Sequence, residues 1–303
     1  MFKLTTVREY FQIGTEVEFE DVHIDSDNRI YLDLHAVRLN QGPEPFRSQA
    51  LESADTFLGE LAAAVLSGDP VRVNRSSELL CNFREPWQTR MGMSHEGFRG
   101  HGGAQWTGGA VLDAMTTNAE ALVRVGVLKH LEQLPLFVDG VGNDICSDLT
   151  ARVIMDALLD FTECQMHIHS GLRIETEMTD IRTWDANFQR WKSRRLQLPA
   201  PGGHPLVLVP SGWARANPLM TARRFHGVAV LGHVQESEAR IDPKTGRLMT
   251  ISKEVLKKRS DLADIRDANI RVTLEALSHN KFLLKSFEAY LAEWFRMQDN
   301  VAA

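Results

Sequence analysis

The chain has 303 residues, of which 43% are hydrophobic and 24% are charged, and its formal net charge is −6 at pH 7. This is the composition of an ordinary globular protein that is long enough to bury a substantial core. The acidic balance argues against a protein whose whole surface is covered with DNA-binding lysines.

The cysteine content and the hydropathy indicate the compartment. The three cysteines, Cys81, Cys146 and Cys164, show no CxxC spacing, which favours a reducing environment and excludes a standard zinc finger. The chain contains no run of about 18 apolar residues and begins without the apolar region of a signal peptide. We therefore expect a cytoplasmic protein with no membrane span.

Positive charge gathers in one part of the chain. Residues 181–260 contain 15 Lys and Arg against 5 Asp and Glu, a balance of +10, so the remainder carries −16. Such a segment is typical of a surface that faces phosphates, for example a nucleic-acid contact. It is equally consistent with two oppositely charged parts of one protein that pair with each other.

Hydrophobic periodicity predicts an α/β (α+β) protein: a mixed sheet of few strands surrounded by helices, with a helical C-terminus. A hairpin opens the chain, and a glycine-rich loop covers residues 90–109. The expected strands span residues 16–24, 29–37, 136–138 and 206–209. The expected helices span residues 54–66, 71–82, 110–133, 149–166, 253–260, 262–277 and 281–297. One domain over 1–303 is expected, with a subdivision into 1–198 and 204–303 as the alternative.

The strongest candidate for chemistry is the segment Gly140–Thr150, where a glycine turn with two carboxylates precedes a helix. Asp144 and Asp148 are four residues apart, and hard divalent cations prefer oxygen ligands of this kind. Asp148, or Ser147 beside it, is equally well explained as a helix N-cap.

A second candidate is the pair Glu85 and Arg90, at a helix end that faces the glycine loop. Such a pair could act as an anion clamp and a metal ligand, or could form a simple surface ion pair. A third candidate is Asp33, which strand alternation places on one face with Tyr31 and His35. It could be a third carboxylate of the site or part of a solvated strand face.

Histidines suggest a weaker alternative. Cys164, His167 and His169 lie at the end of an expected helix, and His95 and His101 lie in the glycine loop. Zinc is conceivable there, but no four-ligand set is evident.

Taken together, these segments resemble a family of uncharacterised bacterial proteins associated with mobile defence systems. The resemblance rests on an acidic strand, a Glu-Pro motif followed by a Leu-Gly-x-Ser sequence, a Gly-x-Gly-x-Asp-x-x-Ser-Asp-x-Thr helix start and a strand that ends in Val-Pro-Lys. The corresponding residues are 32–34, Glu85-Pro86 with 91–94, 140–150, and 207–211, followed by the basic stretch 246–258.

This resemblance implies a restriction-endonuclease-like core in which carboxylates hold Mg²⁺ and a lysine stabilises the charged transition state. Two positions depart from the pattern. Leu34 replaces a proline, and Ser211 replaces the lysine, so that Arg215, Lys192 or Lys253 would have to substitute for it, or the protein is inactive.

We therefore expect a Mg²⁺- or Mn²⁺-dependent nuclease or phosphodiesterase of a bacterial antiviral defence or toxin-like system. Asp144, Asp148, Glu85 and Arg90 are its expected catalytic residues, and Asp144, Asp148 and Asp33 its expected metal ligands. The alternative is a non-catalytic subunit that binds nucleic acid through residues 181–260, or a protein partner, or a second copy of itself. A transferase or hydrolase of small molecules is a weaker third interpretation.

Overall fold

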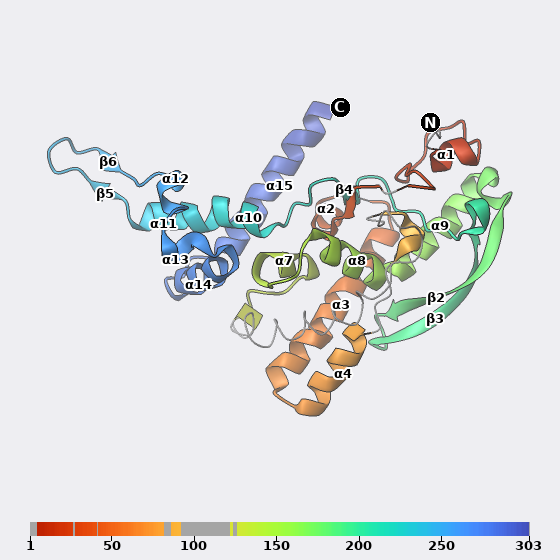
Figure 1. Cartoon of the computed structure of the whole chain (residues 1–303), viewed down its shortest axis with the longest axis horizontal. Coiled ribbons are helices and arrows are strands. Elements are labelled where there is room, and N and C mark those ends of the chain that lie inside the picture. The colour runs from red at the N-terminus through yellow and green to blue at the C-terminus, as the bar shows by residue number, and fades with distance from the viewer. Residues whose placement is uncertain are drawn as a thin grey trace.

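The computed structural model describes residues 5–26, 28–40, 42–81, 86–91, 122–123 and 126–302 of the chain. The described part is an α+β fold in which helices dominate and the strands form three separate two-stranded sheets (Figure 1). This confirms the predicted fold class and the helical C-terminus. The small sheets do not show the expected restriction-endonuclease-like core.

The first part of the fold surrounds two long helices that lie side by side, α3 (Phe46–Ser67) and α9 (Met155–Ile168). Helix α3 buries Phe57, Leu58 and Leu61 on one face, at the spacing that predicted it, and ends at Gly68 in a left-handed conformation (φ 62°). The other elements of this part are α1 (Val7–Tyr10), β1 (Tyr31–Leu32), α2 (Leu34–Leu39), α4 (Pro70–Cys81), η1 (Trp87–Thr89), η2 (Leu131–Gln133), α7 (Leu134–Phe137), α8 (Asn143–Val153) and η3 (Ser170–Arg173).

A long antiparallel hairpin, β2 (Thr176–Asp185) with β3 (Arg190–Pro199), curves along α9. The sequence pattern did not predict it, because charged residues occur on both of its faces. Trp184 and Trp191 are directly opposite each other in the register, and their rings pack with Phe57 of α3. This aromatic cluster fastens the end of the hairpin to the helices.

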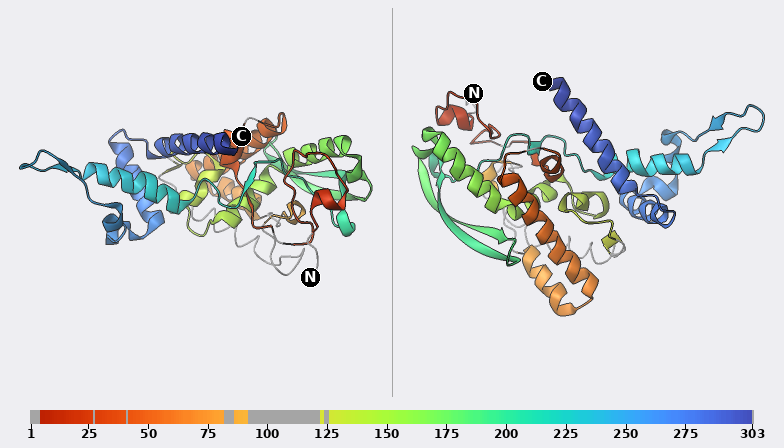
Figure 2. Two further views of the ribbon diagram at one scale, coloured as in Figure 1. Left: turned by 90° about the horizontal axis from the view of Figure 1, so that it is seen from above. Right: turned by 180° about the vertical axis from the view of Figure 1, so that it is seen from behind.

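The C-terminal part is helical and carries a small projecting hairpin. Strands β5 (Arg240–Ile241) and β6 (Leu248–Met249) pair at the end of the molecule, and we call residues 240–249 the arm (Figures 1 and 2). The remaining elements are η4 (Pro201–Gly203), β4 (Ala214–Arg215), α10 (Ala222–Phe225), the π-helical turn η5 (His226–Val230), α11 (Leu231–Ser237), α12 (Lys253–Leu256), α13 (Ser260–Ala263), α14 (Ile265–Ser278) and α15 (Leu283–Ala302).

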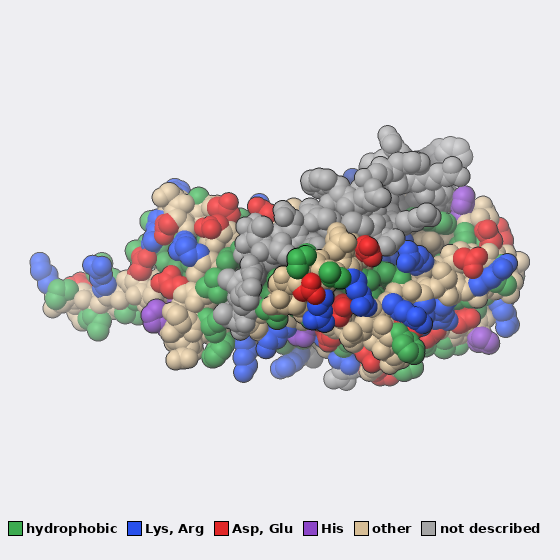
Figure 3. All heavy atoms as spheres, turned by 90° about the horizontal axis from the view of Figure 1, so that it is seen from below, with side chains coloured by type: hydrophobic (Ala, Val, Ile, Leu, Met, Phe, Trp, Pro, Cys, Tyr) green, Lys and Arg blue, Asp and Glu red, His purple; other side chains and the backbone are tan. Residues whose placement is uncertain are grey.

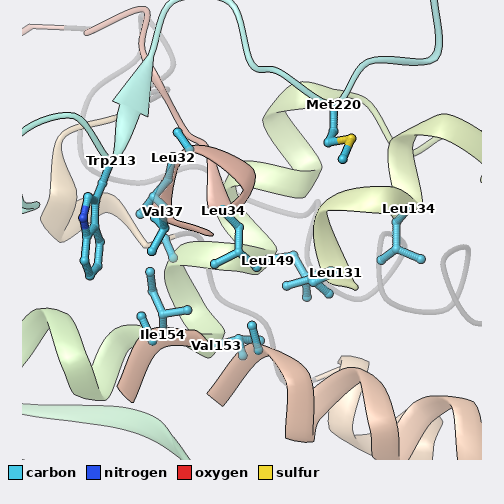
Figure 4. Close-up of a cluster of buried hydrophobic side chains, with 14 of the residues drawn as sticks. Leu32, Leu34, Val37, Leu131, Leu134, Leu149, Val153, Ile154, Trp213 and Met220 are labelled. Carbon is cyan, nitrogen blue, oxygen red and sulfur yellow. The ribbon is translucent and has the colours of Figure 1, made fainter. Parts of the chain in front are cut away.

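A central group of buried side chains joins segments that are distant in sequence (Figure 4). Leu32, Leu34 and Val37, from β1 and α2, pack with Leu149 of α8. Trp213 and Met220, from the segment that precedes α10, complete the group. The buried hydrophobic side chains of the described residues form one connected cluster from Val7 to Phe295. Domain division stays a prediction.

Two strand predictions are wrong. The expected hairpin of residues 16–24 and 29–37 is absent from these residues: the first run is mostly irregular, and the second contains the two-residue strand β1 followed by α2. Residues 136–138, expected as a strand, begin inside helix α7. Residues 29–37 and 136–138 are largely buried, and burial rather than strand pairing explains their apolar side chains.

Residues 206–209 are extended and buried, as expected, but they belong to no sheet. Their backbone N–H groups find separate partners: Val207 donates to the carbonyl of Gln88 (2.9 Å), and Leu208 donates to the hydroxyl of Thr162 (2.9 Å). The burial was predicted correctly, whereas strand pairing was not. The expected helix of 110–133 and the glycine loop of 90–109 lie mostly outside the described residues.

No helix in the described part of the chain is both long and apolar enough to cross a bilayer.

Candidate functional site

Asp33 lies at the junction of β1 and α2 and is the N-cap of that helix. Its Oδ1 accepts hydrogen bonds from the backbone N–H groups of His35 (3.1 Å) and Ala36 (3.2 Å), and its Oδ2 accepts one from Leu219 (2.7 Å). The expectation that Asp33 shares a strand face with Tyr31 and His35 is therefore wrong, because a helix begins at Leu34. Asp33 is a capping residue that also joins two distant segments.

The carboxyl group of Asp33 is almost completely buried, with 3% of the residue exposed. Burial raises its pKa, although hydrogen bonds from Leu219 and Ala36 and the charges of His35 and Arg215 act in the opposite direction. Arg215 is on β4, and its Cα pairs in the sheet with Tyr31. One of the three cations that were considered as replacements for the missing lysine is thus close to Asp33.

The other two cations and Ser211 lie elsewhere. Lys192 Nζ is 3.0 Å from Asp156, and Lys253 Nζ donates to the carbonyl of Gly227 (2.7 Å). Ser211 is exposed, and its backbone N–H donates to the carbonyl of Glu18. Arg215 is therefore the candidate that the fold brings to Asp33.

The segment Gly140–Thr150 forms the turn before α8 and most of that helix. Gly142 is the N-cap, so Ser147 and Asp148 lie inside the helix, and the expectation that one of them caps it is wrong. The hydroxyl of Ser147, which is buried, accepts a hydrogen bond from the backbone N–H of Leu32 (2.9 Å). The helix is thereby fastened to β1, directly beside Asp33.

A small pocket lies between these segments. Its volume is about 10 Å³, which is enough for about one water molecule. Its walls come from the β1–α2 junction, η2, the start of α8 and the segment before α10, and the lining residues are Leu32, Asp33, Leu34, Glu132, Pro135, Asn143, Cys146, Pro218 and Met220. Asp33 therefore lies close to the predicted motif of residues 140–150. The residues of the motif that line the pocket with Asp33 are Asn143 and Cys146, and not Asp144 and Asp148.

Glu132 is a second buried carboxylate of this pocket, which sequence reasoning missed. Its Oε1 accepts a hydrogen bond from Arg38 Nε (2.5 Å) and lies 3.8 Å from His35 Nδ1, whereas its buried Oε2 has no hydrogen-bond partner among the residues that the structure describes. Burial alone would raise the pKa of Glu132, but His35 and Arg38 lower it overall. No sequence motif marks Glu132; the only signal is a charged residue within an apolar run.

Cys146 shares the pocket with these acids. Burial, reinforced by the charges of Glu132 and Asp33, raises the pKa of its thiol to about 12. A thiol with so high a pKa is protonated at neutral pH and is therefore a poor nucleophile.

An ion-pair network continues from the pocket toward solvent. Arg38 pairs with Asp55 of α3 through both guanidinium Nη atoms, and His130 Nδ1 lies 3.1 Å from Asp55 Oδ1. Burial would raise the pKa of Asp55, but His130 and Arg38 lower it overall. This network holds α2, α3 and η2 together.

The remaining predicted ligands are only partly gathered. Asp144 is exposed in the first turn of α8, Asp148 is half-buried one turn later, and Glu85 lies outside the described residues. Among the residues that the structure describes, no three His, Cys, Asp or Glu side chains are close enough to hold one metal ion. The described residues therefore do not by themselves fit the expected Mg²⁺ or Mn²⁺ site.

The histidines that suggested zinc also have other surroundings. His167 Nδ1 is 2.7 Å from the carbonyl of Glu163 one turn earlier, and the ring of His169 packs edge-on to Phe19. His95 and His101 lie outside the described residues.

Arg90 was expected to face the glycine loop or to lie on the surface, but it is buried and has no exposed surface. Its guanidinium donates hydrogen bonds to the backbone carbonyls of Ile24 (3.2 Å), Trp87 (3.1 Å), His204 (2.9 Å) and Pro205 (3.2 Å). Burial lowers its pKa to about 10. Arg90 thus joins three backbone segments, which is a structural role.

The basic segment 181–260 divides into two parts in the structure. On the β2–β3 hairpin, Arg194 forms ion pairs with Asp156 (2.8 Å) and Asp160 (2.7 Å) of α9. These cations are neutralised by acidic residues of the same chain, as the intramolecular alternative predicted.

On the arm, Arg240, Lys244 and Arg247 are exposed and form no ion pair with any residue that the structure describes. Figure 3 shows Lys and Arg side chains beside hydrophobic ones on the projecting arm. Apolar side chains are exposed beside them: Ile241 is 70% exposed, Leu248 67% and Met249 60%. Three exposed cations of the segment are thus presented together with apolar side chains on a projecting hairpin.

Comparison with known families matches residues 12–221 to a domain of unknown function, DUF8370. Neither the curated proteins nor the solved structures contain a match to this chain. The matched range includes Asp33, Glu132 and α8 and ends just before α10, so the arm and the last helices follow it. Because the match covers more than half of its residues, this chain belongs to the DUF8370 family.

Proposed function

We propose that this protein binds nucleic acid through its arm. The observation that supports the proposal is the exposure of Arg240, Lys244 and Arg247 on a projecting hairpin, without ion pairs to the described residues. Elsewhere in the basic segment, Arg194 and Lys192 already have acidic partners. The arm therefore offers phosphates three exposed cations on one short hairpin, offset by a single carboxylate, Asp242.

The shape of the arm suits this role. A two-stranded ribbon fits into the major groove of duplex DNA, and exposed Ile, Leu and Met side chains can contact bases or sugars. An isolated two-stranded hairpin is only marginally stable in water. Contact with a polyanion would stabilise it.

The test is fluorescence anisotropy with labelled duplex DNA, single-stranded DNA and RNA at several salt concentrations. A variant with Arg240→Gln, Lys244→Gln and Arg247→Gln should bind more weakly. If each cation contacts one phosphate, the slope of log K against log salt should fall by about 3. A control with Arg72→Gln, Arg173→Gln and Lys285→Gln removes the same charge from exposed positions outside the arm. Equal binding by the two variants would contradict the proposal.

A second candidate is metal-dependent phosphodiester hydrolysis by a nuclease of a bacterial defence system. It is supported by the placement of Asp33 beside the start of α8, with Ser147 fastening the two segments. A bound Mg²⁺ or Mn²⁺ would polarise a phosphoryl oxygen. Asp144 and Asp148 would be ligands together with residues outside the described part of the chain, because no three carboxylates of the described residues converge, and Arg215 would take the place of the missing lysine.

Calorimetric titration with Mg²⁺ and Mn²⁺ tests this candidate, with supercoiled DNA and RNA incubated in parallel. Asp144→Ala should abolish both binding and cleavage, whereas Asp139→Ala, an exposed carboxylate shortly before α8, should leave both unchanged. Metal binding that survives Asp144→Ala, or no binding by the wild type, would leave a non-catalytic binding protein. A protein partner or a homodimer stays a prediction for that case.

A further inference from the structure

The two strands of the arm are paired in a register that sorts its side chains. Arg240 is directly opposite Met249, and Ile241 is directly opposite Leu248. Opposite residues of an antiparallel pair lie on the same face, and neighbours along one strand lie on different faces. Arg240 and Met249 are therefore on one face of the arm, and Ile241 and Leu248 are on the other.

The pairing extends one residue further toward the tip of the arm. The backbone N–H of Asp242 donates to the carbonyl of Arg247 (2.9 Å), so these two residues are also opposite each other. By alternation they lie on the same face as Arg240. We call the face of Arg240, Asp242, Arg247 and Met249 the charged face, and the face of Ile241 and Leu248 the apolar face.

The carboxylate of Asp242 is used within the turn of the arm. It accepts hydrogen bonds from the backbone N–H of Lys244 (2.8 Å) and from the hydroxyl of Thr245 (2.8 Å). The charged face has two arginines against this one carboxylate, and Lys244 adds a further cation at the tip. The arm is therefore positive overall, and its charged residues lie on one face and at the tip.

The apolar face is open to solvent. The arm projects from the end of the molecule (Figures 1 and 2), and Ile241 is 70% exposed and Leu248 67% exposed. A two-stranded hairpin of this kind is only marginally stable in water. Covering the apolar face would remove both side chains from water and stabilise the arm.

The geometry favours the same face of a second arm as that cover. The two faces point in opposite directions, so a nucleic acid that contacts the charged face leaves the apolar face uncovered. Two identical apolar faces can pack against each other about a two-fold axis. The arginines of both arms then stay on the outside, where they do not oppose each other.

The size of this contact sets when it forms. Two large side chains from each copy are far fewer than the about 20–30 residues a side of a standard protein interface. Such a contact would not hold a dimer together in solution. It would form where nucleic acid brings two copies close and raises their effective concentration.

We propose that two arms pack through their apolar faces and that this pair bridges two nucleic-acid segments, one on each outer charged face. Packed sheets lie about 10 Å apart, so the two segments would be on opposite sides of a thin double layer. The bound polyanions would offset the repulsion between two positively charged arms. This inference rests on the function proposed above and adds that the protein joins two segments.

A bridging assay tests the inference. One biotinylated DNA duplex is fixed on streptavidin beads, and the protein-dependent capture of a second, fluorescent duplex is measured. A variant with Ile241→Thr and Leu248→Thr makes the apolar face polar but keeps residues that favour strands. Capture should fall about tenfold. Affinity for one free duplex, measured by anisotropy, should stay within about twofold.

A matched control changes two exposed apolar residues outside the arm. Val71 is 76% exposed and Ile174 is 80% exposed, and a variant with Val71→Thr and Ile174→Thr should capture the second duplex as the wild type does.

Disulfide trapping tests the contact directly. In the presence of duplex, Leu248→Cys should form a covalent dimer on oxidation, because the two apolar faces meet. Met249→Cys lies on the charged face and should give no more dimer than the wild type, whose native cysteines set the background. Equal dimer from Leu248→Cys and Met249→Cys would overturn the inference.

The outcomes separate this inference from the proposed function. A wild-type protein that binds one duplex but captures no second one would overturn the bridging and leave nucleic-acid binding intact. Equal losses of binding and capture in the Ile241→Thr and Leu248→Thr variant would also overturn it, because the apolar face would then contact nucleic acid itself. If the glutamine variant of the arm binds as well as its control, the proposed function fails, and the bridging fails with it.

Discussion

The carboxylate of Asp33 accepts a 2.7 Å hydrogen bond from the backbone N–H of Leu219, which is 186 residues later in the chain. The same carboxylate caps α2. One side chain thus fixes the start of a helix and the position of the segment that leads from β4 to α10. Asp33 also lines the pocket, together with Pro218 and Met220 on either side of Leu219 in the sequence.

Replacing Asp33 should therefore destabilise the protein more than the loss of an ordinary helix cap. We expect Asp33→Ala to lower the free energy of unfolding by about 2–4 kcal/mol, because it removes a cap and leaves the buried N–H of Leu219 unpaired. Asp264→Ala is the matched control, since Asp264 caps α14 through two backbone N–H groups but is exposed. Its cost should be about 1 kcal/mol. Urea unfolding measures both, and equal costs would contradict the dual role of Asp33.

Arg90 should be required for folding rather than for phosphate binding. Arg90→Ala would leave the buried carbonyls of Ile24 and Pro205 without their guanidinium donors, and we expect a loss of about 3 kcal/mol or more. Arg72→Ala, at an exposed position on α4, should change stability by less than about 0.5 kcal/mol. Full stability of Arg90→Ala together with weakened phosphate binding would instead favour the anion clamp that the sequence suggested.

The ion pairs between the β2–β3 hairpin and α9 should make stability depend on pH. Burial raises the pKa of Asp156, but hydrogen bonds from Arg194 and Lys192 lower it overall. A carboxylate with a lowered folded-state pKa stabilises the protein above its unfolded pKa, about 3.9, and loses that contribution as the pH falls through the lowered value.

Arg194→Gln should therefore cost about 1 kcal/mol at pH 7, and the difference from the wild type should shrink as the pH falls below about 4. Arg195→Gln, at the exposed neighbouring position, should show little difference at either pH. Unfolding at pH 7 and pH 3 measures these effects. A difference for Arg194→Gln that is the same at both pH values would show that its contribution is not electrostatic.

Cys146 should react slowly with alkylating reagents. Burial and the neighbouring acids raise its pKa to about 12, so only about one thiol in 10,000 is ionised at pH 8. Both cysteines are half-buried, so the raised pKa distinguishes Cys146. Iodoacetamide should therefore label Cys164 first, and labelling of Cys146 should increase about tenfold per pH unit between pH 8 and 10. Peptide mass spectrometry separates the two sites. Equal labelling rates at pH 8 would contradict the raised pKa of Cys146.

Much of the helical structure follows from local sequence. The apolar spacing of Phe57, Leu58 and Leu61 predicted α3, and similar patterns predicted α4, α14 and α15 to within a few residues at most of their ends. Helical periodicity is local, since each turn places residues three and four apart on one face. The predicted α+β class and the helical C-terminus follow from the same kind of information.

The strands were harder to predict, for a physical reason. An alternating run such as residues 29–37 contains no information about a pairing partner, and here its carboxylate starts a helix instead. Conversely, the hairpin of β2 and β3 was not predicted because both strands carry many charged residues. Arg194 of β3 is neutralised by Asp156 and Asp160 of α9, and the sequence pattern does not show this pairing. Strand formation depends on contacts across the chain.

By itself the sequence determined the composition, the charge asymmetry and most helices. Only the tertiary structure decided that Arg90 is a buried support and that Glu132 and Cys146 share a pocket with Asp33. The reason is that the role of a polar side chain depends on its burial and its partners. For Asp33 and Arg90 those partners, at Leu219 and His204, are more than a hundred residues away.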